Sequence, residues 1–182
     1  LLLTGEPARV ADLVTSDNVI GQGHFDVSRN GVLIYYANNT GAGTGGEDSW
    51  EFQLQWVDRS AQQLGPVGPY GFYRGVEVSP DGKQRVAVHR HDGTGGDIWV
   101  IEPPPSAPKR ITFDATQDNS SPVWSPDGSR IVFASHRNGK WGLYETRSDG
   151  SGTDGELLLE SELPKAPMSW SPDGKRLVFW VS

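Results

Sequence analysis

Residues 122–134 read PVWSPDGSRIVFA, two β-prone runs joined by the quartet Ser125-Pro126-Asp127-Gly128. The same quartet occurs at residues 79–82 and 171–174, so successive copies begin 46 residues apart. A degenerate copy at residues 28–31 reads SRNG and begins 51 residues before the first full copy. The glycine-rich residues 41–46 accommodate the excess length. The chain is therefore a tandem repeat of one unit.

Each unit alternates short β-prone runs with turn residues, a pattern that predicts four strands. The strands expected in two successive units are residues 75–78, 85–88, 97–101 and 109–113, then 122–124, 130–134, 141–145 and 156–159. Four antiparallel strands in roughly 40 to 50 residues are typical of a β-propeller blade, because one small sheet must stack on its neighbours to bury both faces. We predict an all-β fold, a partial β-propeller of about three four-stranded blades with incomplete blades at both ends.

Turn chemistry accounts for the quartet itself. Proline presets φ at the second position of the turn, aspartate caps the backbone, and glycine takes the left-handed conformation that returns the chain. We interpret Asp81, Asp127 and Asp173 as turn residues, rather than as metal ligands or catalytic acids. Trp124 and Trp170 precede the quartet at equal register, which favours packing between adjacent blades.

The length of the chain limits the number of blades. It has 182 residues, 35% of them hydrophobic, which allows a sizeable core but fewer complete blades than the four to eight of a typical ring. We expect a fragment of a longer polypeptide, able to self-associate through open blade faces. The predicted divisions of this single domain, residues 1–182, are the end of a preceding blade (1–22), three blades (23–69, 70–115 and 116–162) and the start of a further blade (163–182).

Charge and hydropathy restrict the partners. Sixteen basic and 23 acidic residues give a net charge of −7 without a basic run, which disfavours nucleic acid. No apolar stretch approaches the length of a membrane span, so we expect no membrane contact by this segment. The lack of cysteine excludes disulfides and thiol chemistry, but it is compatible with both cytosolic and oxidising compartments.

Motifs for catalysis are not found. The chain has no Gly-x-Ser-x-Gly elbow for a nucleophile, and the glycine-rich residues 41–46 are followed by Glu47 and Asp48, which repel phosphate. Residues 149–156 alternate oxygen-bearing side chains with glycine but lack the spacing of a calcium-binding hand, so we interpret them as a hairpin loop. We expect a segment that is not an enzyme and holds no cofactor.

His89 and His91 alternate along an expected strand and share one face of it, the spacing of a two-imidazole metal site. A third ligand is not evident nearby, although Asp92 and Asp97 in the adjoining turn could complete a site. Solvated histidines at strand ends are commoner than metal ligands. We predict no metal site and keep zinc binding as the alternative.

Residues 119–135, NSSPVWSPDGSRIVFAS, with echoes at residues 76–88 and 169–179, resemble the WD-like repeats of bacterial TolB-type propellers. The resemblance covers most of the chain. It implies a bacterial origin and a scaffold for protein association, which in the TolB case is periplasmic.

A closer resemblance is to the C-terminal propellers of bacterial serine/threonine protein kinases, carried by residues 23–28, 31–35, 54–60 and 63–65. It implies a sensor or docking module beyond a membrane-crossing segment. No kinase motif is present, so no catalytic residue is carried over. The chain is also similar to the propeller of prolyl-oligopeptidase-type peptidases, which implies a substrate-gating lid on a separate hydrolase domain.

We expect a non-catalytic segment that recognises a protein or peptide within a larger bacterial protein, in an extracytoplasmic (periplasmic) location. Propellers bind through loops around the channel mouths and along the rims. The candidate loops are residues 38–48, 89–96 and 136–140, and they could instead be only solvated. The candidate contact residues in these loops are Asn38, Asn39, His89, His91, His136 and Arg137.

Overall fold

The computed structural model describes eight stretches of the chain. These are residues 25–27, 33–37, 51–60, 62–91, 95–103, 106–113, 118–152 and 154–182. The described residues form thirteen β-strands and no helix. Within them, no helix is long and apolar enough to cross a membrane.

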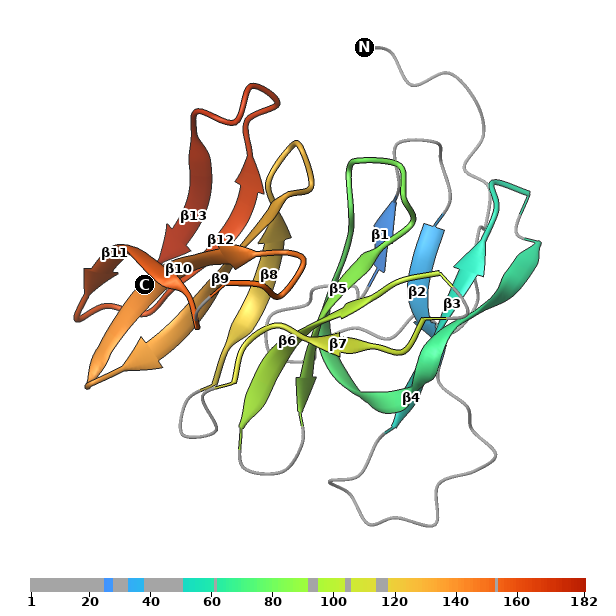
Figure 1. The fold of residues 1–182 in the computed structure, drawn as a ribbon, viewed down its shortest axis with the longest axis horizontal. Coiled ribbons are helices and arrows are strands. Elements are labelled where there is room, and N and C mark those ends of the chain that lie inside the picture. The colour runs from blue at the N-terminus through green and yellow to red at the C-terminus, as the bar shows by residue number, and fades with distance from the viewer. Residues whose placement is uncertain are drawn as a thin grey trace.

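The strands form three antiparallel sheets that follow one another in chain order (Figure 1). The first sheet has seven strands in sequence order: β1 (Phe25–Val27), β2 (Leu33–Ala37), β3 (Phe52–Val57), β4 (Gln63–Val78), β5 (Val86–His91), β6 (Gly96–Ile101) and β7 (Lys109–Arg110). The second sheet has the order β11 (Glu156–Ser161), β10 (Lys140–Arg147), β9 (Arg130–Arg137) and β8 (Ser120–Trp124). The third pairs β12 (Lys165–Trp170) with β13 (Leu177–Val181).

The seven-stranded sheet contains two four-stranded groups that share the long strand β4. Its residues up to Gly71 pair with β3, and those from Phe72 onward pair with β5. The continuous backbone of β4 crosses the expected blade boundary at residues 69 and 70. The sequence contains no sign of this continuity, because Gly65, Pro66, Gly68, Pro69 and Gly71 all favour a break. The division of the chain into individual blades stays a prediction.

All eight strands expected from the two repeat units are present, and most are extended by a few residues. The exception is the strand expected at residues 109–113, which ends at Arg110. There the Thr112 hydroxyl accepts a hydrogen bond from the Ile98 amide at 3.0 Å, in the place of a backbone carbonyl. The Ile111 amide still donates to the Ile98 carbonyl at 2.8 Å, so the side chain has replaced one bond of the ladder, and the regular strand stops.

The turn interpretation of the quartet is confirmed. Gly82, Gly128 and Gly174 have φ of 77°, 69° and 68°, the left-handed region that glycine adopts without strain. In the second copy the Asp127 carboxylate accepts hydrogen bonds from the Ser125 hydroxyl at 2.6 Å and the Ser129 amide at 3.0 Å. The third copy repeats these contacts at Asp173 with almost the same distances.

The apolar core lies between neighbouring blades. One cluster joins Ile98, Val100 and Ile111 to residues of the next sheet, among them Trp124 and Phe133. Trp124 is buried, and its indole N–H donates to the Glu77 carbonyl at 3.0 Å, so its predicted place between blades is confirmed. Trp170, at the same register in β12, is only half-buried. The strands β8 and β12 pack against the preceding strands, which sets the spacing of the units.

Candidate functional site

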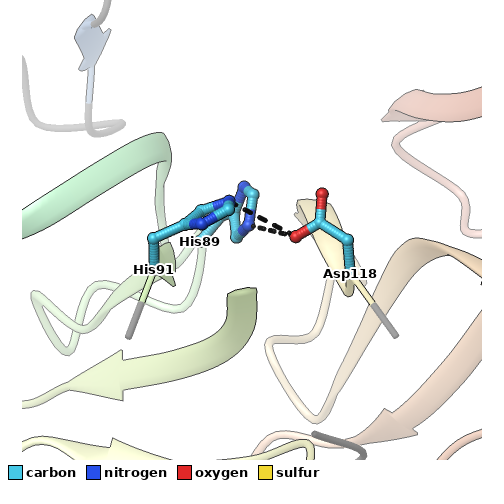
Figure 2. A group of neighbouring side chains, drawn as sticks. All are labelled: His89, His91 and Asp118. Atoms are coloured by element: carbon cyan, nitrogen blue, oxygen red, sulfur yellow. Dashed lines mark hydrogen bonds and ion pairs between the residues drawn. The ribbon is translucent and has the colours of Figure 1, made fainter. Parts of the chain in front are cut away.

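Two histidines and an aspartate converge where β5 faces the segment that leads into β8. Figure 2 shows His89 and His91 turned toward one carboxylate oxygen of Asp118. The Nε2 atoms of His89 and His91 lie 3.0 and 3.4 Å from Asp118 Oδ1. The two imidazole rings are 4.8 Å apart between centroids. Together the three side chains offer ligand atoms within 4.8 Å of one another.

The β-strand periodicity brings the two histidines to one face, as expected. His89 is 4% exposed, whereas Asp118 is 49% exposed, so the cluster runs from the interior to the surface. His91 is the register partner of Gly96 on β6. A Cβ atom at Gly96 would lie 2.0 Å from His89 Nε2 and 2.9 Å from Asp118 Oδ1, so only glycine leaves room for the cluster.

The electrostatic surroundings favour the charged form of Asp118. Partial burial acts to raise the pKa of its carboxyl, but the hydrogen bond and charge of His89 outweigh burial, together with the charge of His91 and the Gly96 amide. The net result is a pKa below the ordinary aspartate value. The Gly96 amide donates to the same Oδ1 at 3.0 Å, so this amide and the two imidazoles surround one oxygen.

A buried polar network holds the backbone at Asp118. The adjacent residue Asn119 is fully buried, and its backbone N–H donates to the Gly96 carbonyl at 2.9 Å. Its side chain donates to Asp97 Oδ1 at 3.1 Å and accepts from Arg137 at 3.2 Å. Asn119 thereby ties β6 to β9, and this fixes the carboxylate next to the histidines.

Asp97 has a structural role in this network. Its Oδ1 also accepts a hydrogen bond from the Thr112 hydroxyl at 2.6 Å, and its other oxygen pairs with Arg110. It is not a member of the histidine cluster, so the hypothesis that Asp97 completes that cluster is wrong. The reason is local, because Arg110 at the end of β7 and Thr112 just beyond it satisfy the carboxylate. Asp92, the other suggested ligand, lies outside the described residues.

The structure places the other candidate contact residues apart from this cluster. His136 lies on β9 with its ring 4.8 Å from that of Trp141. The Arg137 guanidinium lies 4.0 Å from the centre of the Tyr144 ring and donates to the Asp154 carbonyl at 2.8 Å. These contacts hold Arg137 in the blade. Asn38 and Asn39 lie outside the described residues, and partner contact by any of the six residues stays a prediction.

Asp118 is the residue of this site that sequence reasoning missed. It lies 29 residues after His89 and belongs to no motif. One available signal was its place immediately before Asn119, where the clearest repeat begins, since the start of each unit must meet the strands of the preceding one. Chemically, the cluster offers two imidazoles and a carboxylate, a donor set for hydrogen bonding or metal coordination.

The successive antiparallel sheets, each with the same turn between two of its strands, pack against one another and define a β-propeller. The chain belongs to the TolB beta propeller domain family, whose model matches residues 71–182. This membership confirms the all-β partial propeller and the TolB-type resemblance. The relation to kinase-attached propellers stays a prediction.

Solved structures share this fold at low sequence identity. A protein assigned as TolB from Agrobacterium tumefaciens has 22% identity and a TM-score of 0.69, over 88% of this chain and 54% of that protein. TolB from Acinetobacter baumannii has 21% identity and a TM-score of 0.63, over 84% and 36% of the two chains.

An oligogalacturonate lyase solved in complex with manganese is similar in fold only, with 15% identity and a TM-score of 0.64 over 84% of this chain and 45% of that one. The chain thus spans about half or less of each of these proteins.

Proposed function

We propose that this chain is a non-catalytic recognition segment of a β-propeller, and that it binds a protein or peptide. The observation that carries the proposal is membership of the TolB propeller family, and the exposed apolar side chains of β13 are one candidate surface. On β13, Val178, Trp180 and Val181 are 47–62% exposed. Exposed groups of large apolar side chains are characteristic of surfaces that meet another polypeptide.

The candidate loop at residues 136–140 offers a second, polar surface for recognition. In the structure its central residues, Asn138 and Gly139, form a tight turn with positive φ between β9 and β10. His136 and Lys140 flank this turn, with Lys140 placed 3.7 Å from Glu160. A rigid turn of this kind presents its side chains with little loss of conformational entropy on binding.

Peptide selection tests recognition directly. The full chain is immobilised and exposed to a displayed random-peptide library, and each enriched peptide is then measured by fluorescence anisotropy against its scrambled version. We expect saturable one-to-one binding in the micromolar range, on the order of −8 kcal/mol. Enriched peptides that bind no better than their scrambled versions would contradict the proposal.

Two variants separate the candidate surfaces. If the β13 surface binds the selected peptides, Val178→Glu should lower their affinity at least roughly tenfold, because a charge would enter an apolar contact. If the loop binds, Lys140→Ala should have the larger effect. Wild-type affinity in both variants would exclude these two surfaces.

For the whole protein we propose a bacterial polypeptide that carries this propeller as its extracytoplasmic sensor or docking part, as in the serine/threonine kinases whose propellers it resembles. The solved relatives are roughly twice or more as long as the aligned segment, which supports a larger parent. Two alternatives remain: a TolB-like periplasmic adaptor and the substrate gate of a prolyl-oligopeptidase-type peptidase.

The coding sequence on both sides of this segment distinguishes the three parents. A kinase domain and an apolar segment upstream would support the sensor. A signal peptide upstream with no further domain would support the adaptor, and a hydrolase domain downstream would support the gate. The last two results would each contradict the kinase parent.

A further inference from the structure

Two of the separations in the histidine cluster match those between ligands of one metal ion, and all three ligand atoms lie within 4.8 Å of one another. For a metal–ligand distance of about 2.1 Å, neighbouring ligand atoms lie roughly 3.0 Å apart at right angles and roughly 3.4 Å apart in a tetrahedron. The observed separations from Asp118 Oδ1 are 3.0 Å to His89 Nε2 and 3.4 Å to His91 Nε2. Both histidines present the same type of atom toward one carboxylate oxygen.

The next blade has the same strand pairing without the complete cluster, so the blade architecture does not require the cluster residues. His91 pairs with Gly96 across β5 and β6, and His136 pairs with Trp141 at the same register across β9 and β10. In that second blade the Trp141 ring contacts His136. In the first blade glycine leaves this space open, and His89 and Asp118 occupy it.

The residues at the other two ligand positions, His89 and Asp118, have no metal-binding counterpart in the next repeat unit. His89 pairs with Ile98, and the residue at the corresponding register of the next blade is Ala134, paired with Leu143. Asp118 lies 46 residues before Pro164, which has no ligand atom in its side chain. Three changes from the repeat, at His89, Gly96 and Asp118, thus meet at one point.

The surroundings hold the ligands in place before any ion arrives. His89 is buried, the Gly96 amide orients Asp118, and Asn119 anchors the backbone through Gly96 and Asp97. Hydrogen-bonded supports of this kind raise the affinity of metal sites, because the ligands lose little freedom on binding. Asp118 is half exposed, which gives an ion a path to the site.

We propose that His89, His91 and Asp118 bind one divalent transition-metal ion, with zinc as the first choice. Two imidazoles and one carboxylate suit zinc, and three protein ligands leave at least one position for water or a partner group. The single negative charge of Asp118 partly neutralises the ion. The site is separate from the β13 surface and from the turn at residues 138–139, so it adds a property to the proposed recognition role.

Calorimetric titration of the full chain with zinc chloride, after removal of metals by a chelator, tests the site. We expect one ion per chain in the wild type. His91→Ala and Asp118→Asn each remove a ligand, and each should weaken binding by more than the roughly 10- to 100-fold cost of losing a residue that only hydrogen-bonds to a ligand. His136→Ala is the matched control, because it removes a histidine at the same register of the next blade that is not part of the cluster. Its zinc affinity should stay within about twofold of the wild type.

Circular dichroism establishes that each variant is folded, and cobalt supplies an independent readout. Cobalt bound by the wild type should give a visible absorption band that is lost in Asp118→Asn. Gly96→Ala should also abolish zinc binding, because its Cβ would meet His89 Nε2. Gly75→Ala is its control, since the new Cβ would contact the Pro122 and His89 side chains at an ordinary 3.5–3.6 Å.

Several outcomes would overturn the proposal. One is the lack of saturable zinc binding by the wild type. Another is an equal loss of affinity in His136→Ala, which would indicate adventitious surface binding. Unchanged affinity in folded Asp118→Asn or Gly96→Ala would also refute the site. If a ligand variant does not fold, the cobalt spectrum of the wild type and the Gly96 and Gly75 pair still decide the question.

Discussion

Asp127 shows what one residue of the repeated turn contributes. The Ser125 hydroxyl, and then the Ser129 amide and hydroxyl, donate hydrogen bonds that lower the pKa of the Asp127 carboxyl to about 2. The folded chain therefore holds the ionised form more strongly than the unfolded chain does. The stabilisation is complete above the ordinary aspartate pKa and is lost as the pH falls toward 2.

Asp127→Asn should lower the free energy of unfolding at pH 7 by about 0.5–1 kcal/mol, because exposed charge-assisted hydrogen bonds are weakened. Urea unfolding at several pH values measures the effect, with the exposed Glu162→Gln as a control for the loss of one charge. The difference from the wild type should shrink as the pH falls through the interval from about 4 to 2. A difference of the same size at pH 2 would contradict the assigned cause.

Arg85 links two copies of the turn. Its guanidinium donates to Asp81 at 2.6 Å and to the Gly128 carbonyl at 2.7 Å, and it lies 4.7 Å from the centre of the Trp124 ring. Arg130 holds the corresponding place after the next turn, but its side chain is 52% exposed, against 12% for Arg85. The same residue type therefore has a buried role in one unit and a surface role in the next.

Arg85→Ala should destabilise the chain by about 1.5–3 kcal/mol, because it removes the charged partner of Asp81 and one of the two donors to the Gly128 carbonyl, the other being the Ser148 hydroxyl. Arg130→Ala should cost less than about 1 kcal/mol, as is usual for an exposed ion pair. Chemical denaturation of both variants gives the comparison. Equal losses would show that the position of the arginine between blades is not what matters.

Strands of neighbouring units are joined by carboxylates at one repeated position. Asp26 on β1 and Glu77 on β4 each lie two residues before the serine of their copy of the turn. Asp26 accepts a hydrogen bond from the Val78 amide, and Glu77 accepts one from the Trp124 amide. Val123 holds this position in the following unit, so the same link is not repeated there.

Burial raises the pKa of Glu77 well above its usual range; the Trp124 amide opposes this rise and the charge of Asp26 adds to it. Between the ordinary glutamate pKa and the raised value, the unfolded chain ionises while the folded chain stays protonated. The stability of the fold therefore decreases as the pH rises through this interval.

Glu77→Gln should remove this pH dependence, since glutamine still accepts the hydrogen bond from Trp124 without carrying a charge. We expect a melting temperature a few degrees above that of the wild type at pH 7 and little difference at pH 4. The exposed Glu156→Gln on β11 is the control. Thermal melts that show the same shift at both pH values would contradict an origin in ionisation.

At the scale of the whole molecule, the turns form a series along the chain. A Cβ atom at Gly128 would lie 2.9 Å from Asp81, and one at Gly174 would lie 3.8 Å from Pro126, so each copy packs on the one before it. At the C-terminal side, β13 pairs only with β12 among the described strands and leaves Val178, Phe179, Trp180 and Val181 exposed. An apolar sheet of this kind is a site for association.

We predict that the chain self-associates through β13. Sedimentation velocity should show a concentration-dependent increase in the weight-average sedimentation coefficient for the wild type. Val178→Glu combined with Val181→Glu should weaken association at least roughly tenfold, because charges on the contact must be desolvated. A wild type that stays monomeric at high concentration, or a double variant that associates equally well, would contradict the role of this strand.

Sequence reasoning succeeded where the structure depends on neighbouring residues. The turn at Asp127 needs only residues 125–130, so the quartet predicts it in every copy. It did not predict the left-handed Gln84, the one residue by which the first turn exceeds the others. Nor did it predict the end of β7, where the Thr112 side chain competes with the backbone of a strand.

The sequence by itself determined the all-β class, the order of the strands and the turns between them, because periodicity and turn chemistry act over a few residues. Only the tertiary structure decided that Asp118, and not Asp97, joins His89 and His91. It also decided that Arg85 is buried while Arg130 is exposed. These outcomes depend on how one blade packs on the next, and contacts across that interface join residues tens of positions apart that share no local pattern.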